Sequence, residues 1–281
     1  MAENLQLNWV NRAEECARRW SLTDIIWRPD VSTAHVGLCD SPLGPAVVKV
    51  SIEPRMVGPE ALALSHFGES CPKVYGVAED CESLLLERID VAEDLSATYP
   101  SAQEEIEVFL PFLKSVLAHS NVPTGFPTLQ EYADVFSRVK DRSPNSQVTK
   151  ILDMGHQHKA MLMGTPSENR LLHGDMHHFN ILRDVSGRWR LIDPHGVVGY
   201  AYYELGAFLR NPWKACYTEP GVLSRLAERV AMLAVRLGIS ESEVAMWGFY
   251  GAAFSVAWSL EDGSADLDGM VVMAESCLSL A

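Results

Sequence analysis

Between residues 20 and 90, short apolar runs alternate with turn residues, which is the pattern of β-strands joined by tight connections. Residues 46–52 form the clearest run, because they are rich in β-branched side chains around a single lysine, Lys49. Residues 58–67 instead have apolar positions at helical spacing. The pattern therefore predicts three strands, a helix and two strands, with the strands at residues 25–28, 35–39, 46–52, 73–77 and 83–88.

Beyond residue 90 the apolar spacing becomes mainly helical. Pro111, inside the first predicted helix, is a candidate for a kink or a break. Residues 244–260 form the longest uncharged apolar stretch, which falls short of the roughly 18 residues of a membrane span and predicts a buried helix. The pattern predicts short strands at 181–183 and 189–192, and helices at 102–118, 129–139, 147–163, 202–209, 221–237, 241–260 and 266–280.

The change of pattern predicts two parts, residues 1–89 and 90–281, and 281 residues suffice for two modest domains that share a cleft. The net charge of −14 argues against a nucleic-acid partner and fits a cationic substrate, although taken alone it is better explained by plain solubility. The N-terminus lacks the basic start and apolar core of a signal peptide. Six cysteines without a C-x-x-C pair indicate reduced thiols, so we expect a cytoplasmic protein without a membrane partner.

Residues 173–193 carry the chemistry. Asn180 follows Asp175 by five residues and Asp193 ends the next predicted strand, so we expect three oxygen-bearing side chains to point toward one place. Phosphoryl transfer needs such a set: one carboxylate takes the proton of the acceptor hydroxyl, while a carboxylate and an amide oxygen bind Mg²⁺. Two other interpretations stay open: a purely structural loop, or a transition-metal site made by His173, Asp175, His177 and His178.

The motif His-Gly-Asp-x-His-x-x-Asn, followed by Ile-Asp-Pro, resembles the signature of aminoglycoside phosphotransferases and related small-molecule kinases. With its doubled histidine and an Asp-Pro-x-Gly-x-x-Gly stretch, it resembles the streptomycin 6-phosphotransferase and hydroxyurea kinase group. Pro212 after Arg210-Asn211 also fits that group. The resemblance implies a two-lobed, protein-kinase-like α+β fold: an N-terminal lobe with an antiparallel five-stranded sheet and one helix, and a mainly helical C-terminal lobe.

Carried over by position, the resemblance implies that Asp175 is the catalytic base and that Asn180 and Asp193 hold Mg²⁺. It also implies that Lys49 pairs with the phosphates of ATP and forms an ion pair with Glu60. Residues 30–34 stand where a phosphate-binding loop is expected, yet they include no glycine, so the contacts of this loop stay open. The other implied nucleotide contacts are Ser32 and Thr33 in this loop, and Glu87 and Ile89 at the adenine hinge.

His173 is implied to brace the loop by hydrogen bonds. Contacts with the acceptor are the least certain part, because ordinary packing or a solvated charge explains each candidate equally well. Glu204 is the clearest example, since an acid at this place either steadies the catalytic loop or simply begins a helix. The candidates are His178, Glu204, Trp258, Glu261 and Asp262.

The implied activity is ATP- and Mg²⁺-dependent phosphorylation of a hydroxyl on a small cationic antibiotic of the streptomycin type, which confers resistance, by a monomer or weak dimer. Alternative acceptors are a basic peptide antibiotic of the tuberactinomycin type, hydroxyurea, a sugar or an amino alcohol. An inactive nucleotide-binding pseudokinase is a different class, against which the intact set of polar residues argues. A protein kinase is disfavoured, because the sequence has no Asp-Phe-Gly or Ala-Pro-Glu landmark.

Overall fold

The computed structural model describes residues 2–29, 34–52, 57–97, 101–165, 167–212, 222–263 and 267–281. The chain forms two compact units, each of which is described by itself. Unit 1 comprises Met1–Ala92 and Leu182–His195, and unit 2 comprises Glu93–Ile181 and Gly196–Ala281. A segment that follows residue 90 in the sequence, Leu182–His195, therefore belongs to unit 1.

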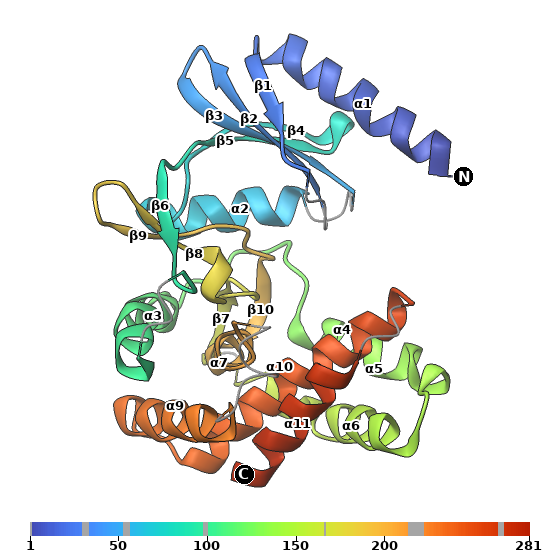
Figure 1. Ribbon diagram of the computed structural model, residues 1–281, viewed down its shortest axis with the longest axis vertical. Coiled ribbons are helices and arrows are strands. Elements are labelled where there is room, and N and C mark those ends of the chain that lie inside the picture. Colours follow the sequence, from blue (N-terminus) through green and yellow to red (C-terminus); the bar gives the residue numbers. More distant parts are fainter. Residues whose placement is uncertain are drawn as a thin grey trace. The chain divides into compact units, whose positions relative to one another are not determined.

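Unit 1 is built on a sheet of five strands: β1 (Thr23–Trp27), β2 (Ala34–Ser41), β3 (Gly44–Ser51), β4 (Val74–Ala78) and β5 (Ser83–Glu87). The spatial order is β1-β2-β3-β5-β4, and each neighbouring pair is antiparallel (Figure 1). Ser41 pairs with Gly44 across a tight turn, where Gly44 has a φ of +106° that glycine adopts without strain. The predicted five-stranded antiparallel sheet is confirmed.

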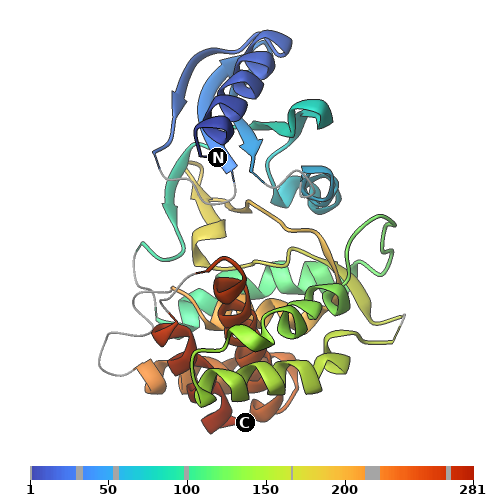
Figure 2. The same cartoon turned by 90° about the vertical axis from the view of Figure 1, so that its right-hand side faces the viewer.

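Two helices of unit 1, α1 (Ala2–Arg19) and α2 (Val57–Phe67), cover opposite faces of this sheet (Figures 1 and 2). Val48 of β3 belongs to the same buried cluster as Cys16 of α1. Because side chains alternate along a strand, Lys49 lies on the other face, where it meets Glu60 of α2. The sequence analysis predicted α2 but not α1, which is mostly polar and contributes only a narrow apolar stripe to the core.

Short elements also lie outside the five-stranded sheet, and three of them are strands that pair in the order β6-β8-β9. The hairpin of β8 and β9 was predicted around its turn at residues 186–187, whereas the short β6 was not. These elements are η2 (Gly68–Ser70), η3 (Glu79–Cys81), β6 (Val91–Asp94), β8 (Ile181–Asp184) and β9 (Trp189–Leu191).

Unit 2 is mainly helical, as predicted. The first helix continues through Pro111 without a break, whereas the helix predicted at 129–139 is divided at Ala133. Gly221 and Asp266, the predicted starts of two helices, lie outside the described residues. The helices are α3 (Ala102–Ala118), α4 (Leu129–Tyr132), α5 (Asp134–Arg138), η4 (Lys140–Arg142), α6 (Ser146–Gln157), η5 (Lys159–Leu162), η6 (His178–Asn180), η7 (Ala201–Tyr203), α7 (Glu204–Leu209), α9 (Val222–Leu237), α10 (Glu241–Glu261) and α11 (Asp268–Leu280).

Helix α10 is the centre of unit 2, and its predicted burial is confirmed. From Val244 to Ala257 every residue except Met246 is buried. Helix α7 crosses it backbone to backbone, because a Cβ atom added at Gly251 would lie 2.5 Å from the backbone of Gly206. Among the helices in the described ranges, none is long and apolar enough to cross a membrane.

Two short strands of unit 2, β7 (Asn169–Leu172) and β10 (Val197–Tyr200), form an antiparallel pair. Leu172 is the partner of Val197, so the segments that follow β7 and precede β10 start side by side. Neither strand was predicted, because a pair of four-residue strands has too few positions for a clear alternation.

Candidate active site

The loop that follows β7 is fixed by the β7–β10 pair. Directly beyond that pair, the Gly196 N–H donates to the carbonyl oxygen of His173 at 3.4 Å. Gly174 has a φ of +85°, in the left-handed region that favours glycine, which explains a glycine before Asp175 in the motif. The loop therefore leaves the strand pair in one defined direction.

The carboxylate of Asp175 is held on several sides. Arg210 Nη2 donates to its Oδ1 at 2.7 Å, and His177 Nε2 lies 3.2 Å from its Oδ2. Asn180 Nδ2 donates to the Asp175 carbonyl oxygen at 3.0 Å and lies 3.4 Å from Oδ2. The side chain is still 19% exposed, and because a carboxylate has about four lone-pair sites, it has capacity for a further hydrogen bond.

Two buried side chains, His173 and Glu204, hold this loop by hydrogen bonds to its backbone. The Asp175 N–H donates to His173 Nδ1 at 3.3 Å, which is the bracing interaction implied for His173. The Gly174 N–H donates to both carboxylate oxygens of Glu204, at 3.1 and 3.3 Å. Burial raises the pKa of Glu204 to about 8, although nearby backbone N–H groups oppose this shift. Glu204 is fully buried, so the structure corrects the expectation that it contacts the acceptor and makes it a brace of the loop.

His178 also differs from the expected acceptor contact, because its side chain is fully buried in unit 2. Its ring stacks on Phe208 with the centroids 4.9 Å apart, and its Nε2 lies 3.5 Å from Glu105 and 3.3 Å from Arg229. Burial lowers the pKa of His178 to about 4, and Arg229 acts in the same direction against Glu105. The two adjacent histidines therefore have different positions: His177 contacts the Asp175 carboxylate, and His178 is buried in the core and anchors the loop.

Glu105 of α3 is the centre of this buried anchor. It forms ion pairs with Arg225 and Arg229 of α9. Burial opposes the charge of Glu105, but His178 and the two arginines outweigh it and lower its pKa below the usual range. The sequence analysis missed this network, although Glu105 stands at helical spacing with buried Phe109, where an apolar residue would be expected.

In unit 1, Lys49 lies between two carboxylates. Its Nζ donates to both oxygens of Glu60, at 2.9 and 3.0 Å, which is the ion pair expected from the resemblance. The same atom donates to Asp193 Oδ1 at 2.6 Å. Lys49 and Glu60 are nearly buried, whereas the Asp193 side chain is 49% exposed. Asp193 has a φ of +58°, a left-handed backbone that is uncommon outside glycine and persists where its surroundings enforce it.

The burial of this cluster sets its protonation. Burial opposes the charge of Lys49, but Asp193 and Glu60 outweigh it and raise the Lys49 pKa above its ordinary value. Burial also raises the pKa of Glu60, and Lys49 acts against that shift. Asp175 and Asn180 belong to unit 2 and Asp193 to unit 1, so their meeting at one metal ion stays a prediction.

The expected adenine hinge lies at the end of β5. The Glu87 side chain accepts from the Lys73 N–H at 3.1 Å and from Arg190 Nη2 at 3.1 Å, so its carboxylate is bound within unit 1. Ile89, just beyond the strand, is half-buried. Ser32 and Thr33 lie outside the described residues. Contact of these positions with a nucleotide stays a prediction.

The other candidates for acceptor contact lie at the end of α10. Trp258 is half-buried, and its ring meets that of Tyr132 edge to face at 6.1 Å. Glu261 forms an ion pair with Arg138 at 2.7 Å, and this hydrogen bond lowers the pKa of Glu261. Asp262 is exposed directly after the helix. Of the two acids, Asp262 has the carboxylate that is more open to solvent.

A transition-metal site gains no support. Within the described ranges, no group of three or more His, Cys, Asp and Glu side chains is placed to hold a metal ion. The buried position of His178 removes one of the four ligands that such a site would need. The thiols described are free and buried, as expected: Cys16, Cys39, Cys71, Cys81 and Cys277.

Arg210 is the main site residue that sequence reasoning did not assign. It follows α7 in the Arg-Asn-Pro segment, and that segment was noted only as a further point of resemblance. The available signal was its place shortly after the Asp-Pro-x-Gly-x-x-Gly stretch. Only the folded chain shows that this arginine returns to Asp175.

The five-stranded antiparallel sheet with its Lys49–Glu60 pair, and the helical unit with its His-Gly-Asp loop, together define a protein-kinase-like fold. Over residues 19–263 the sequence matches the family described as aminoglycoside/hydroxyurea antibiotic resistance kinase. The chain belongs to this family of small-molecule phosphotransferases.

Individual relatives are more distant. Streptomycin 3''-kinase of Klebsiella pneumoniae is 26% identical over 227 residues, which cover 78% of this chain and 81% of that protein. Streptomycin 6-kinase of Streptomyces glaucescens is 25% identical over 203 residues, which cover 70% of this chain but only 64% of that protein, less than two thirds of its length. A thermostable mutant of aminoglycoside phosphotransferase APH(4)-Ia, solved with ADP and hygromycin B, has a TM-score of 0.68 at 15% identity and coverage of 95% and 96%, which shows the shared fold.

Proposed function

We propose that the protein transfers the γ-phosphate of ATP to a hydroxyl group of a small cationic antibiotic of the streptomycin type. The observation that carries this proposal is the state of the Asp175 carboxylate. It is fixed by Arg210, His177 and Asn180, yet part of it is exposed and able to accept a hydrogen bond. A general base needs this combination of fixed orientation and access.

In the proposed reaction Asp175 orients the acceptor hydroxyl and takes its proton at a carboxylate oxygen. The new oxygen–phosphorus bond forms as the bond between the γ-phosphorus and the bridging oxygen of ADP breaks, and ADP leaves. Arg210 and His177 prevent rotation of that carboxylate, because one contacts Oδ1 and the other Oδ2. Most of the rate gain comes from positioning and charge stabilisation, with a smaller share from proton transfer.

Lys49 is the residue proposed to meet the phosphates of ATP. An ammonium group has three donors, and Glu60 and Asp193 are its acceptors in unit 1. If the Asp193 carboxylate no longer accepts from Lys49, one N–H group of Lys49 can donate to a phosphate oxygen. Glu60 still holds the amine in place.

The residues present fit Mg²⁺, which prefers oxygen ligands. Asn180 uses its Nδ2 for Asp175, which leaves its carboxamide oxygen as the ligand. Asp193 offers a half-exposed carboxylate. When held by Asn180 and Asp193, Mg²⁺ would offset the negative charge of the phosphates.

The acceptor class rests on family membership and charge. Two relatives carry streptomycin in their names, and the family description includes hydroxyurea. Streptomycin carries two guanidinium groups, which an acidic chain of net charge −14 favours by long-range attraction. A basic peptide antibiotic suits the same charge, whereas hydroxyurea or another small metabolite would use the site without that attraction.

The test is ADP release with Mg-ATP across a panel of streptomycin, a deoxystreptamine aminoglycoside, a tuberactinomycin peptide, hydroxyurea, and a few sugars and amino alcohols. We expect a rate with streptomycin that falls by orders of magnitude in Asp175→Asn, while nucleotide binding persists. Asp141→Asn, an exposed acid in η4, is the matched control and should keep the wild-type rate.

Each outcome separates the candidates. A rate with another member of the panel only would transfer the proposal to that acceptor. Turnover of Asp175→Asn within a few-fold of wild type would remove Asp175 as the base. Normal nucleotide binding without turnover of any acceptor would favour an inactive nucleotide-binding protein.

A further inference from the structure

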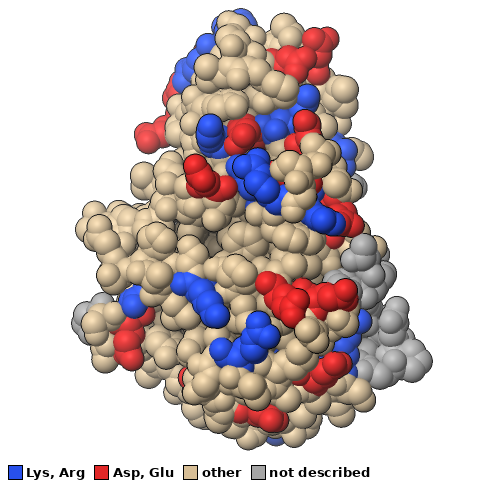
Figure 3. Space-filling view, turned by 90° about the vertical axis from the view of Figure 1, so that its left-hand side faces the viewer, with Lys and Arg blue, Asp and Glu red and all other residues tan. Residues whose placement is uncertain are grey.

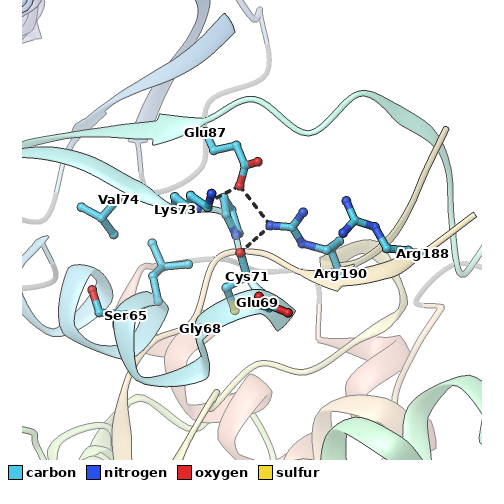
Figure 4. Close-up of a pocket in the computed structure, with 11 residues that line it drawn as sticks. Ser65, Gly68, Glu69, Cys71, Lys73, Val74, Glu87, Arg188 and Arg190 are labelled. Atoms are coloured by element: carbon cyan, nitrogen blue, oxygen red, sulfur yellow. Dashed lines mark hydrogen bonds and ion pairs between the residues drawn. The ribbon is translucent and has the colours of Figure 1, made fainter. Parts of the chain in front are cut away.

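Unit 1 contains a cavity of about 510 Å³ that the proposed reaction does not use (Figure 4). Its wall is formed by the end of α2, the turn that follows it, the start of β4 and the β8–β9 hairpin. All of these elements belong to unit 1. The cavity is therefore a feature of one compact body.

Arg190 of β9 is the buried cation of this cavity, with only 7% of its surface exposed. Its Nη2 donates to the Cys71 carbonyl oxygen at 2.5 Å and to Glu87 Oε2 at 3.1 Å. Its Nε atom is buried and has no hydrogen-bond partner among the described residues. A buried N–H without a partner is unfavourable, so an acceptor that reached this atom would stabilise it.

Two further cations line the same cavity, although the chain as a whole is strongly acidic. Lys73 is exposed and has no ion-pair partner within the part of the chain that the structure describes. Arg188 binds Asp184 at 3.1 Å but leaves 70% of its side chain exposed. Figure 3, which faces the side where this hairpin projects in Figure 1, shows Lys and Arg side chains gathered with a few acids among them.

The acids around the cavity leave several N–H donors of these cations unused. Arg190 pairs with Glu87 and Arg188 pairs with Asp184, so neither guanidinium carries uncompensated charge, but each has further N–H donors. Among the described residues that line the cavity, Lys73 is the cation without a paired acid and Glu69 is the acid without a paired cation. Leu64, Pro72 and Val74 add an apolar side.

We propose that this cavity binds a small organic oxyanion, a carboxylate or a phosphate ester, whose charged group accepts from Arg190, Lys73 and Arg188. The apolar body of the ligand lies against Leu64 and Val74. This site shares none of Lys49, Glu60 and Asp193, the residues proposed for the phosphates of ATP and the metal ion, whereas Glu87 in its wall is also an expected adenine contact. Oxyanions are the partners that clustered guanidinium and ammonium groups recognise best.

The test is calorimetric titration with inorganic phosphate and, separately, citrate, at constant ionic strength with chloride as the balancing anion. The background is Lys49→Met, so that phosphate at the proposed nucleotide site does not contribute. We expect saturable binding of at least one probe, and the better probe tells whether the site suits phosphates or carboxylates. Absence of binding for both probes at millimolar concentration would overturn the proposal.

Variants locate the bound anion. Lys73→Gln and Arg188→Gln should each weaken binding by about threefold, and Arg190→Gln by about tenfold or more. Arg236→Gln, an exposed arginine of α9 with the same loss of charge, is the control and should bind like the parent. If Arg190→Gln fails to fold, the exposed Lys73 and Arg188 decide, and unchanged binding in both places the anion elsewhere and refutes the site.

Discussion

Each unit contains a buried carboxylate held by cations, and the two clusters differ in how far water reaches them. In unit 1, Glu60 and Asp193 share Lys49, and the Asp193 side chain is half exposed. In unit 2, Glu105 meets Arg229, Arg225 and His178, and neither Glu105 nor His178 has any exposed surface. The first cluster has more acid than base, and the second has more base than acid.

Because of this difference, the Lys49 cluster of unit 1 can exchange partners, whereas the Glu105 cluster of unit 2 has a structural role. An open carboxylate beside a lysine allows a metal ion or phosphate to replace one contact without breaking the other. A closed cluster has no route to new partners, so its ion pairs fix α3, α9 and the loop that carries His178. Changes in unit 1 should therefore act on turnover, and changes in the closed cluster on stability.

The largest effect is expected for Glu105→Gln. Removal of the fully buried Glu105 charge leaves the buried Arg229 without its counter-ion, which typically costs about 3–5 kcal/mol. Chemical denaturation should show this loss as a lower free energy of unfolding. Glu107→Gln, an exposed acid on the same helix, should stay within about 0.5 kcal/mol of wild type, and an equal loss in both variants would contradict the distinction.

The counterpart in unit 1 is Lys49→Met. Loss of a preorganised cation at the phosphates should lower kcat/KM by about 10²–10³-fold in the panel assay. Its stability should fall less than in Glu105→Gln, because Asp193 stays half exposed to water and the raised pKa of Glu60 lets this buried acid take up a proton once Lys49 is gone. Lys150→Met, on the exposed side of α6, should keep full activity. A stable Lys49→Met with near-normal turnover would refute the exchangeable role.

Sequence reasoning identified the Lys49–Glu60 pair of unit 1 but not the Glu105 cluster of unit 2. The difference has a physical cause. The resemblance implied the pairing of Lys49 with Glu60, and these residues stand in β3 and in α2, the next helix along the chain. Glu105 and Arg229 are 124 residues apart, and their pairing depends on how α3 packs on α9. No local pattern encodes such a contact.

The same limit explains the errors at the loop. The motif predicted that His173, Asp175 and Asn180 lie in one loop, and the hydrogen bonds among them are present. It did not predict which of the paired histidines points inward, because both positions are compatible with the spacing. The burial of His178 and Glu204 depends on Phe208 and α7, which come later in the chain.

An intermediate loss of stability is expected when the pH is lowered. The pKa of His178 is lowered to about 4 in the folded protein from an ordinary value of 6.5, so between these values the unfolded chain binds more protons. The stability that His178 contributes is therefore present above pH 6.5 and is lost as the pH falls toward 4, by an amount on the order of 3 kcal/mol. The measurement is the free energy of unfolding across this window.

The matched variants isolate that titration. His178→Phe keeps a ring against Phe208 but cannot bind a proton, so its stability should fall less steeply between pH 6.5 and 4. His158→Asn, at an exposed position after α6, should keep the wild-type slope. Equal slopes for all three proteins would show that His178 is not the group responsible.

The smallest effect is expected for Arg210→Gln. This arginine lies in unit 2, yet we expect its loss to change turnover more than stability. Arg210 contacts the Asp175 carboxylate at 2.7 Å, so we expect it to act by fixing the orientation of the base. Its loss should lower kcat by about tenfold through a less fixed carboxylate, with little change in the KM for ATP. Arg210→Lys should restore part of kcat because it keeps the positive charge. The restoration should be incomplete because lysine lacks the planar guanidinium group. A purely structural arginine would instead lower stability and leave the kcat of the folded fraction unchanged, so the split between kcat and KM decides whether Asp175 needs Arg210 to act as a base.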